Sequence, residues 1–293
     1  MKIILLTILL FTACVTQAFA GINVVATLPW IGSLAKEIGK EKIDVTVLVK
    51  PNQDAHTIEA KPSMILAARK ADIIMYDGLD LEIGYLPLII ESSKNPKLMP
   101  GQIGNLDCSQ FITPLEKPTS VDRSMGDVHP LGNPHYHFSP SRVLRVADGM
   151  ARLLADVDKA NADFYLGNYK AFTEQVKAKE KEWHAVPLKG KKYVAYHKYF
   201  EYLANEFGFQ IIGYLEPKPG IPPSATHIEE LIVLMKREMP AAILVTSAYG
   251  KEEAESLSSK TGVKVIVLPN DVGSMPGTDN LIFFWDKVVT SLK

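Results

Sequence analysis

The chain is poor in cysteine and has no surplus of basic residues. Its 293 residues include two cysteines, Cys14 and Cys108, and the formal net charge is −1. Such a balance gives no electrostatic case for binding nucleic acid. Since Cys14 falls in an apolar N-terminal segment that resembles a cleaved leader, Cys108 would be the only thiol of the mature chain. We therefore expect no intramolecular disulfide, and a fold held together by its hydrophobic core.

Long apolar runs are missing except at the N-terminus. Residues 1–20 contain an early lysine, an apolar run from Ile3 to Phe11 and a small residue at Ala20. This pattern predicts a secretory signal that is cleaved after Ala20. A membrane span is the alternative, but it needs roughly 20 apolar residues and would have to include the polar pair at positions 16–17. We expect export to the periplasm.

Lipid attachment at Cys14 is an alternative way of processing the same segment. Phe11 stands three residues before this cysteine, where lipid-attachment signals usually have a small aliphatic residue. We therefore prefer simple cleavage, with a lipid anchor at Cys14 as the less favoured location.

Sequence signatures of catalysis are also missing. The chain contains no H-E-x-x-H motif and no independent nucleophile constellation. We therefore expect a binding protein and not an enzyme. A zinc hydrolase, in which three protein ligands leave one position open for an activated water, is the alternative from another functional class.

What the chain does have is an alternation of short β-branched runs with longer amphipathic ones. This order predicts strands connected by crossover helices, which is typical of α/β proteins. The expected strands are 22–28, 44–49, 71–78, 191–196, 210–215, 241–246 and 263–269, and the expected helices are 30–39, 62–71, 198–208, 228–240 and 252–262. The length allows two domains, so we predict two lobes, each a mainly parallel sheet flanked by helices.

One segment between the two groups of strands has a different character. Residues 158–183 contain one glycine and no proline, so they predict a long rigid helix of about seven turns that joins the lobes. The expected division of the chain is a signal peptide at 1–20, an N-terminal lobe at 21–156, a linking long helix at 157–187 and a C-terminal lobe at 188–293.

Histidines and one acid follow the predicted strands. His56 lies in the loop after strand 44–49, His197 directly follows strand 191–196, and Asp271 follows strand 263–269. Loops at the carboxyl ends of parallel strands converge on the crevice where ligands bind. His135 lies in the Gly/Pro-rich stretch GDVHPLGNPHYHFSP, whose prolines and glycines fix the backbone. We expect these four side chains to meet in the cleft between the lobes.

Three imidazoles and one carboxylate make a plausible ligand set for a divalent metal. Nitrogen donors favour Zn²⁺ over magnesium or calcium, which prefer oxygen. Manganese, which suits an oxygen-rich shell, is less favoured. The roles of the two other histidines in the same stretch, His129 and His137, stay open: each could support the ligands, help the metal to enter, or be exposed.

Several stretches resemble one known family. PNQDAHTIEAKPS, ADIIMYDGLDLE, GNPHYHFSP, PPSATHIEELI and LPNDVGSMPG are similar to successive signatures of the zinc and manganese solute-binding proteins of ABC transporters, a family with a long helix that includes adhesin-type lipoproteins. The resemblance implies metal ligands at His56, at His135 in the Asn-Pro-His motif, at His197, and at Asp271 in Asp-Val-Gly. It thus selects the same four residues as the placement of the strands.

The chain also departs from the family pattern. His137 stands where the family usually has tryptophan, Asn133 and Ser139 replace aspartates, and the long histidine-rich loop of many zinc carriers is absent. His137 could therefore face the metal in place of His135. The motif alignment favours His135, which we take as the expected ligand.

These observations predict an exported zinc-binding protein that captures Zn²⁺ and delivers it to an ABC-type permease in the inner membrane. The family resemblance also suggests a periplasmic metallochaperone as a partner and a monomeric state. A manganese carrier of the same family, a zinc hydrolase, and a surface adhesin with a structural metal are the alternatives.

Overall fold

The computed structural model describes residues 21–119, 129–218 and 220–293. The predicted signal peptide and Cys14 lie outside these ranges. Within them, no helix is both long and apolar enough to cross a membrane.

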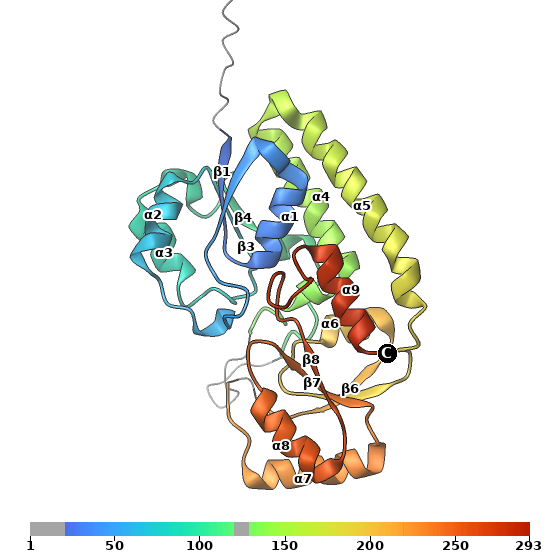
Figure 1. The fold of residues 1–293 in the computed structure, drawn as a ribbon. Coiled ribbons are helices and arrows are strands. Elements are labelled where there is room, and N and C mark those ends of the chain that lie inside the picture. Colours follow the sequence, from blue (N-terminus) through green and yellow to red (C-terminus); the bar gives the residue numbers. More distant parts are fainter. Residues whose placement is uncertain (1–20, 120–128, 219) are drawn as a thin grey trace, which may run out of the picture.

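Two four-stranded parallel sheets form the framework (Figure 1). The first has the strand order β2-β1-β3-β4 and the second the order β6-β5-β7-β8. Their strands are β1 (Ile22–Ala26), β2 (Ile43–Val47), β3 (Ile73–Tyr76), β4 (Asn105–Asp107), β5 (Lys192–Ala195), β6 (Gln210–Tyr214), β7 (Ala242–Thr246) and β8 (Val265–Leu268). The predicted two-lobe α/β fold is thereby confirmed.

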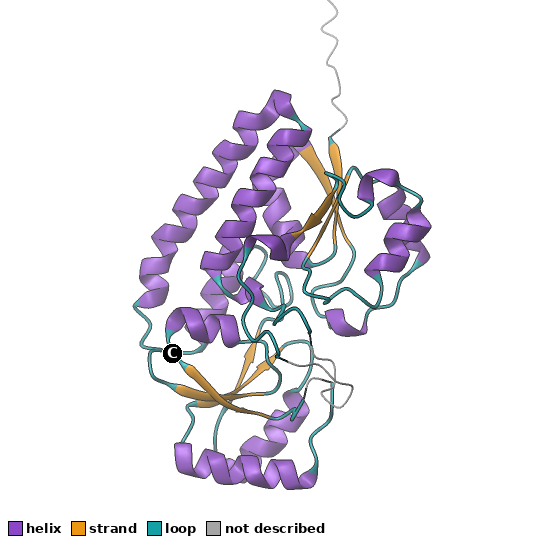
Figure 2. Ribbon diagram, turned by 180° about the vertical axis from the view of Figure 1, so that it is seen from behind, coloured by secondary structure: helices purple, strands orange, loops and turns teal. Residues whose placement is uncertain are grey.

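Helices cover both faces of each sheet, as parallel strands require (Figure 2). In the first lobe, α1 and α4 pack together on one side, and α2 and α3 pack together on the other. In the second lobe, α7 and α8 pack together on the outer side, and α6 and α9 face the first lobe (Figure 1). These helices are α1 (Pro29–Gly39), α2 (Pro62–Lys70), α3 (Leu86–Ser93), α4 (Pro140–Val157), α6 (Glu201–Phe207), α7 (Ala225–Glu238), α8 (Lys251–Thr261) and α9 (Leu281–Ser291).

Short 3-10 turns connect several of these elements. They are η1 (Lys40–Lys42), η2 (Ala55–Thr57), η3 (Pro96–Leu98), η4 (Cys108–Phe111), η6 (Tyr136–Phe138) and η7 (Lys159–Asn161). Of these, η2 and η6 lie in the loops that hold the predicted ligands.

The long helix α5 (Ala162–His184) packs against α1 and α4 of the first lobe and reaches α9 (Figure 1). It has 23 residues, which corresponds to about 35 Å at 1.5 Å per residue. It begins four residues later than the sequence pattern predicts, because the 3-10 turn η7 precedes it. Its Trp183 Nε1 donates a 2.7 Å hydrogen bond to Asp286 of α9, so the end of α5 is fixed to the last helix of the chain.

A continuous hydrophobic core holds the lobes together. The described residues contain no disulfide. One cluster of buried side chains extends from the first sheet through α4 and α5 to α9 and part of the second sheet. A smaller cluster lies between the second sheet and the α7–α8 pair. Cys108 is a buried free thiol within the larger cluster.

Two helical glycines should respond oppositely to alanine. A Cβ built on Gly149 in α4 would lie 2.2 Å from the Phe111 ring, whereas one on Gly167 in α5 meets nothing within 4 Å. We expect Gly149→Ala to destabilise the protein by about 1–3 kcal/mol through overpacking. We expect Gly167→Ala to stabilise it by about 0.5–1 kcal/mol, because alanine is the better helix former.

Chemical denaturation of both variants beside the original protein measures these changes. Equal effects of the two substitutions would contradict the close packing of α4 against the η4 turn.

Candidate metal centre

Three of the four predicted ligands meet between the lobes. His56 lies in η2 after β2, His197 follows β5 by two residues, and His135 directly precedes η6. One ring nitrogen of each histidine lies within 4.8 Å of one ring nitrogen of the other two. The three rings are mutually close, with centroids 5.3 to 5.5 Å apart. Among the described residues, this is the group of three or more potential ligands that could hold a metal ion.

His56 is oriented by a carboxylate two residues before it. Asp54 Oδ1 accepts hydrogen bonds from His56 Nδ1 at 2.6 Å and from the His56 amide at 3.1 Å. Burial would raise the pKa of Asp54, but its hydrogen bonds with His56 lower the pKa below the usual value. An ionised carboxylate accepts only, so His56 Nδ1 carries the proton and Nε2 presents a lone pair. This is the protonation pattern that a metal-binding histidine needs.

His197 has the same arrangement with a partner from the neighbouring strand. Glu216 Oε2 lies 2.6 Å from His197 Nδ1, and both side chains are more than 90% buried. The strand register aligns Ala195 with Tyr214. His197 and Glu216 each follow these strand ends by two residues and therefore lie side by side. Glu216 therefore leaves His197 Nε2 free to bind a metal.

His135 is held through its backbone. Its amide donates to Asn133 Oδ1 at 2.9 Å. The Asn133 side chain in turn donates to the Lys198 carbonyl at 2.8 Å, and the Asn133 carbonyl accepts from Tyr202 at 2.6 Å. His135 is 3% exposed and its Nε2 has no hydrogen-bond partner. A buried nitrogen without a partner is costly, and a metal ion would satisfy it.

His137 points elsewhere. Its Nε2 lies 3.1 Å from the Asn270 carbonyl, to which it can only donate, and its ring stacks on Trp30 with the ring planes 11° apart. His137 is outside the group of three. The structure thus places His135, and not His137, in the cluster.

Asp271 lies close to the cluster but not within the group whose ligand atoms are 4.8 Å apart or less. It is 5% exposed and lines a small cavity of about 20 Å³ together with His56 and His135. Its Oδ1 accepts a 2.6 Å hydrogen bond from the Val272 amide. The fourth predicted ligand is therefore beside the site, with its carboxylate partly engaged by backbone.

Burial favours the neutral form of His135 and His197. It lowers the pKa of His135 well below the usual value, and the neighbouring His56 and His197 lower it further. Burial also lowers the pKa of His197, although the Glu216 carboxylate opposes this shift. For Asp271, burial raises the pKa well above the usual value, with the Val272 and Trp30 amides opposing it. Because neutral imidazoles are the form that binds metals, the two buried histidines do not need to lose a proton first.

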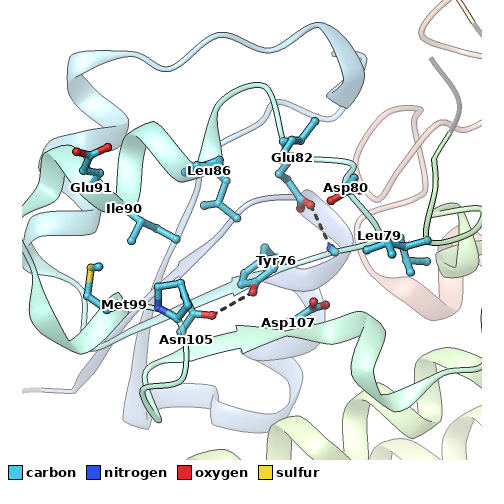
Figure 3. Close-up of a pocket in the computed structure, with 15 residues that line it drawn as sticks. Tyr76, Leu79, Asp80, Glu82, Leu86, Ile90, Glu91, Met99, Asn105 and Asp107 are labelled. Atoms are coloured by element: carbon cyan, nitrogen blue, oxygen red, sulfur yellow. Dashed lines mark hydrogen bonds between the residues drawn. The ribbon is translucent and has the colours of Figure 1, made fainter. Parts of the chain in front are cut away.

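A second hollow, of about 570 Å³, lies in the first lobe between α3 and strands β3 and β4 (Figure 3). It is lined by apolar side chains such as Leu86 and Met99 and by carboxylates including Glu82. Burial raises the pKa of Glu82 to about 7, and its Oε2 accepts from the Gly78 amide at 3.1 Å. None of the four predicted ligands lines this hollow, so it is separate from the histidine cluster.

The chain matches a known family over nearly its whole length. Residues 24–292 match the family model described as zinc-uptake complex component A, periplasmic.

Curated relatives carry names for several metals. The chain is 26% identical over 278 residues to the iron-binding protein YfeA of Yersinia pestis, covering 89% of this chain and 84% of that protein. It is 23% identical over 286 residues to the zinc-binding lipoprotein AdcA of Streptococcus pneumoniae, covering 94% of this chain and 56% of the relative. It is 24% identical over 240 residues to the manganese-binding lipoprotein MntA of Bacillus subtilis, covering 80% and 74% of the two chains.

Solved structures share the fold. A crystal structure of ZnuA has a TM-score of 0.76 at 24% identity and covers 93% of this chain and 100% of that chain. A cadmium-bound periplasmic metal-binding protein from Candidatus Liberibacter asiaticus has a TM-score of 0.75 at 22% identity, with 92% and 97% covered.

Removal of the Glu216 carboxylate tests how the His197 ring is oriented. We expect Glu216→Ala to weaken metal binding about 10- to 100-fold, as is usual for a residue that orients a metal-binding histidine. Glu255→Ala is the control, because Glu255 is an exposed residue of α8. Calorimetric titration with zinc measures both; equal affinities in the two variants would show that Glu216 does not orient a ligand.

Proposed function

Because the chain belongs to the family of periplasmic zinc-uptake complex component A, we propose that it captures Zn²⁺ outside the cytoplasm and delivers it to an ABC-type membrane permease. The observation that carries this proposal is the cluster of His56, His135 and His197. Three buried or half-buried imidazoles, two of them oriented by carboxylates, have their remaining nitrogens directed at one place. Such an arrangement is suited to binding a metal ion.

The donor atoms support zinc as the metal. Relatives are named for iron, zinc and manganese, so membership in the family leaves the metal open. Imidazole nitrogens suit zinc, whereas carboxylate and carbonyl oxygens suit manganese. The three histidines therefore favour zinc.

We propose that Asp271 completes the ligand set on the buried side. His56 and His135 come from the N-terminal half of the chain, and His197 and Asp271 follow strands of the second sheet. A metal bound by residues of both lobes links them, so binding and release of the ion are coupled to the distance between the lobes. This coupling suits a carrier, which must hold its cargo tightly and later give it up.

The family also favours a carrier over a zinc hydrolase. Three histidines with an open fourth position would suit metal-assisted hydrolysis. Membership in a family of metal-uptake components supports transport as the use of the same geometry.

Replacement of His135 should abolish tight zinc binding. His135 contributes a buried nitrogen without any other partner, so we expect His135→Ala to weaken zinc binding by more than the ~100-fold that the loss of an orienting residue can cause. The measurement is calorimetric titration of the chelator-stripped protein with zinc and, separately, with manganese.

His137→Phe is the matched control for this substitution. It is two residues away, and phenylalanine preserves the ring packing against Trp30. We expect it to retain zinc affinity. Loss of binding in His137→Phe with normal binding in His135→Ala would show that the ligand is assigned to the wrong histidine, and no tight site in the original protein would refute the carrier function.

A further inference from the structure

A fourth imidazole stands next to the cluster on its solvent side. His129 Nε2 lies 3.1 Å from His56 Nε2, and the two ring centroids are 5.1 Å apart. Both residues are partly exposed, whereas His135 and His197 are 3% and 5% exposed. His129 therefore lies beside the more exposed member of the cluster, His56.

The spacing of these two nitrogens suits a shared metal ion. Two imidazole nitrogens bound to one tetrahedral zinc at roughly 2.0–2.1 Å lie ~3.3 Å apart. The Asp54 carboxylate places the proton of His56 on Nδ1, so His56 Nε2 directs a lone pair toward His129. The pair is thus prepared for a cation that binds between them or beside them.

Local structure keeps His129 in reach of the cluster. The His129 carbonyl accepts a 3.1 Å hydrogen bond from the Gly132 amide, which closes a turn. Gly132 has φ +121°, and a Cβ there would lie 2.6 Å from Pro114. The next residue, Asn133, donates its amide to the Leu115 carbonyl at 2.9 Å. The turn is therefore tied to the backbone at residues 114–115, close to the anchor of His135.

His129 does not yet contact all members of the cluster. Its ring centroid is 6.4 Å from that of His135, and it stands outside the group of three whose ligand atoms are within 4.8 Å. His129 is half-buried and lies in a turn, so its ring must move to reach an ion that the three other histidines hold.

We propose that His129 is a further metal ligand, which closes the site on its solvent side and makes it select zinc over manganese. This inference rests on the proposed function and adds a fourth imidazole to it without changing the role of Asp271, since zinc sites can expand from four to five ligands. A nitrogen donor at this position raises the preference for zinc, and an oxygen donor would lower it.

X-ray absorption spectroscopy of the zinc-loaded protein counts the imidazoles directly. We expect four imidazoles at the ion in the original protein and three in His129→Ala. His184→Ala is the control, because His184 lies at the exposed end of α5 and packs on Phe207, and it should leave the count at four.

Titration with the two metals tests selectivity in the same proteins. We expect His129→Ala to weaken zinc binding about tenfold or more, within the range seen when supporting groups of a metal site are removed. His129→Asp replaces a nitrogen donor by an oxygen donor. We expect it to lower the ratio of zinc affinity to manganese affinity by about tenfold or more.

Each outcome bears on one of the two proposals. Three imidazoles in the original protein, together with an unchanged affinity ratio in both His129 variants, would overturn the role of His129. If zinc binding is then still lost in His135→Ala, the proposed function stands. An original protein that binds no zinc would overturn both.

Discussion

Two hydrogen bonds between carboxylates and imidazoles determine what this site can do. Asp54 and Glu216 each accept the Nδ1 proton of a histidine at 2.6 Å. Each bond fixes the ring, selects the tautomer and leaves the opposite nitrogen with a lone pair. Burial adds to this effect, because it lowers the pKa of His135 and of His197 and keeps both rings uncharged.

The fold positions the loops that carry these side chains. The carboxyl ends of β2, β5 and β8 lead into the loops with His56, His197 and Asp271, so the two parallel sheets place these three proposed ligands near the space between them. The last helix supports the same place, since Trp285 Nε1 in α9 donates to the His137 carbonyl at 2.9 Å. The α5–α9 hydrogen bond through Trp183 joins the long helix to this support. The loop that bears His135 is therefore tied through α9 to the long helix.

Much of the fold could be predicted from the sequence because parallel strands buried on both faces are continuous apolar runs. Strand 241–246 was predicted within one residue of β7 (Ala242–Thr246), and helix 62–71 within one residue of α2 (Pro62–Lys70). No strand was predicted at β4, because its three residues, Asn105–Asp107, are too few to show a period. The short helix α3 and the terminal helix α9 were likewise not predicted.

The candidate site was only partly visible in the sequence. The positions of His56, His197 and Asp271 followed from their place after strands, and that of His135 from its motif. Glu216 was missed because it lies 19 residues from its partner; only the pairing of β5 with β6 brings the two together. The proximity of His129 to His56 depends on the turn that ends at Gly132, and no sequence period encodes that.

Anomalous diffraction from crystals of the zinc-loaded protein, recorded above and below the zinc absorption edge, is the most direct test of the central claim. The account predicts one strong peak between the lobes, roughly 2.0–2.1 Å from a ring nitrogen of each of His56, His135 and His197. A peak at another place, or none at the histidine cluster in crystals that contain zinc, would contradict it.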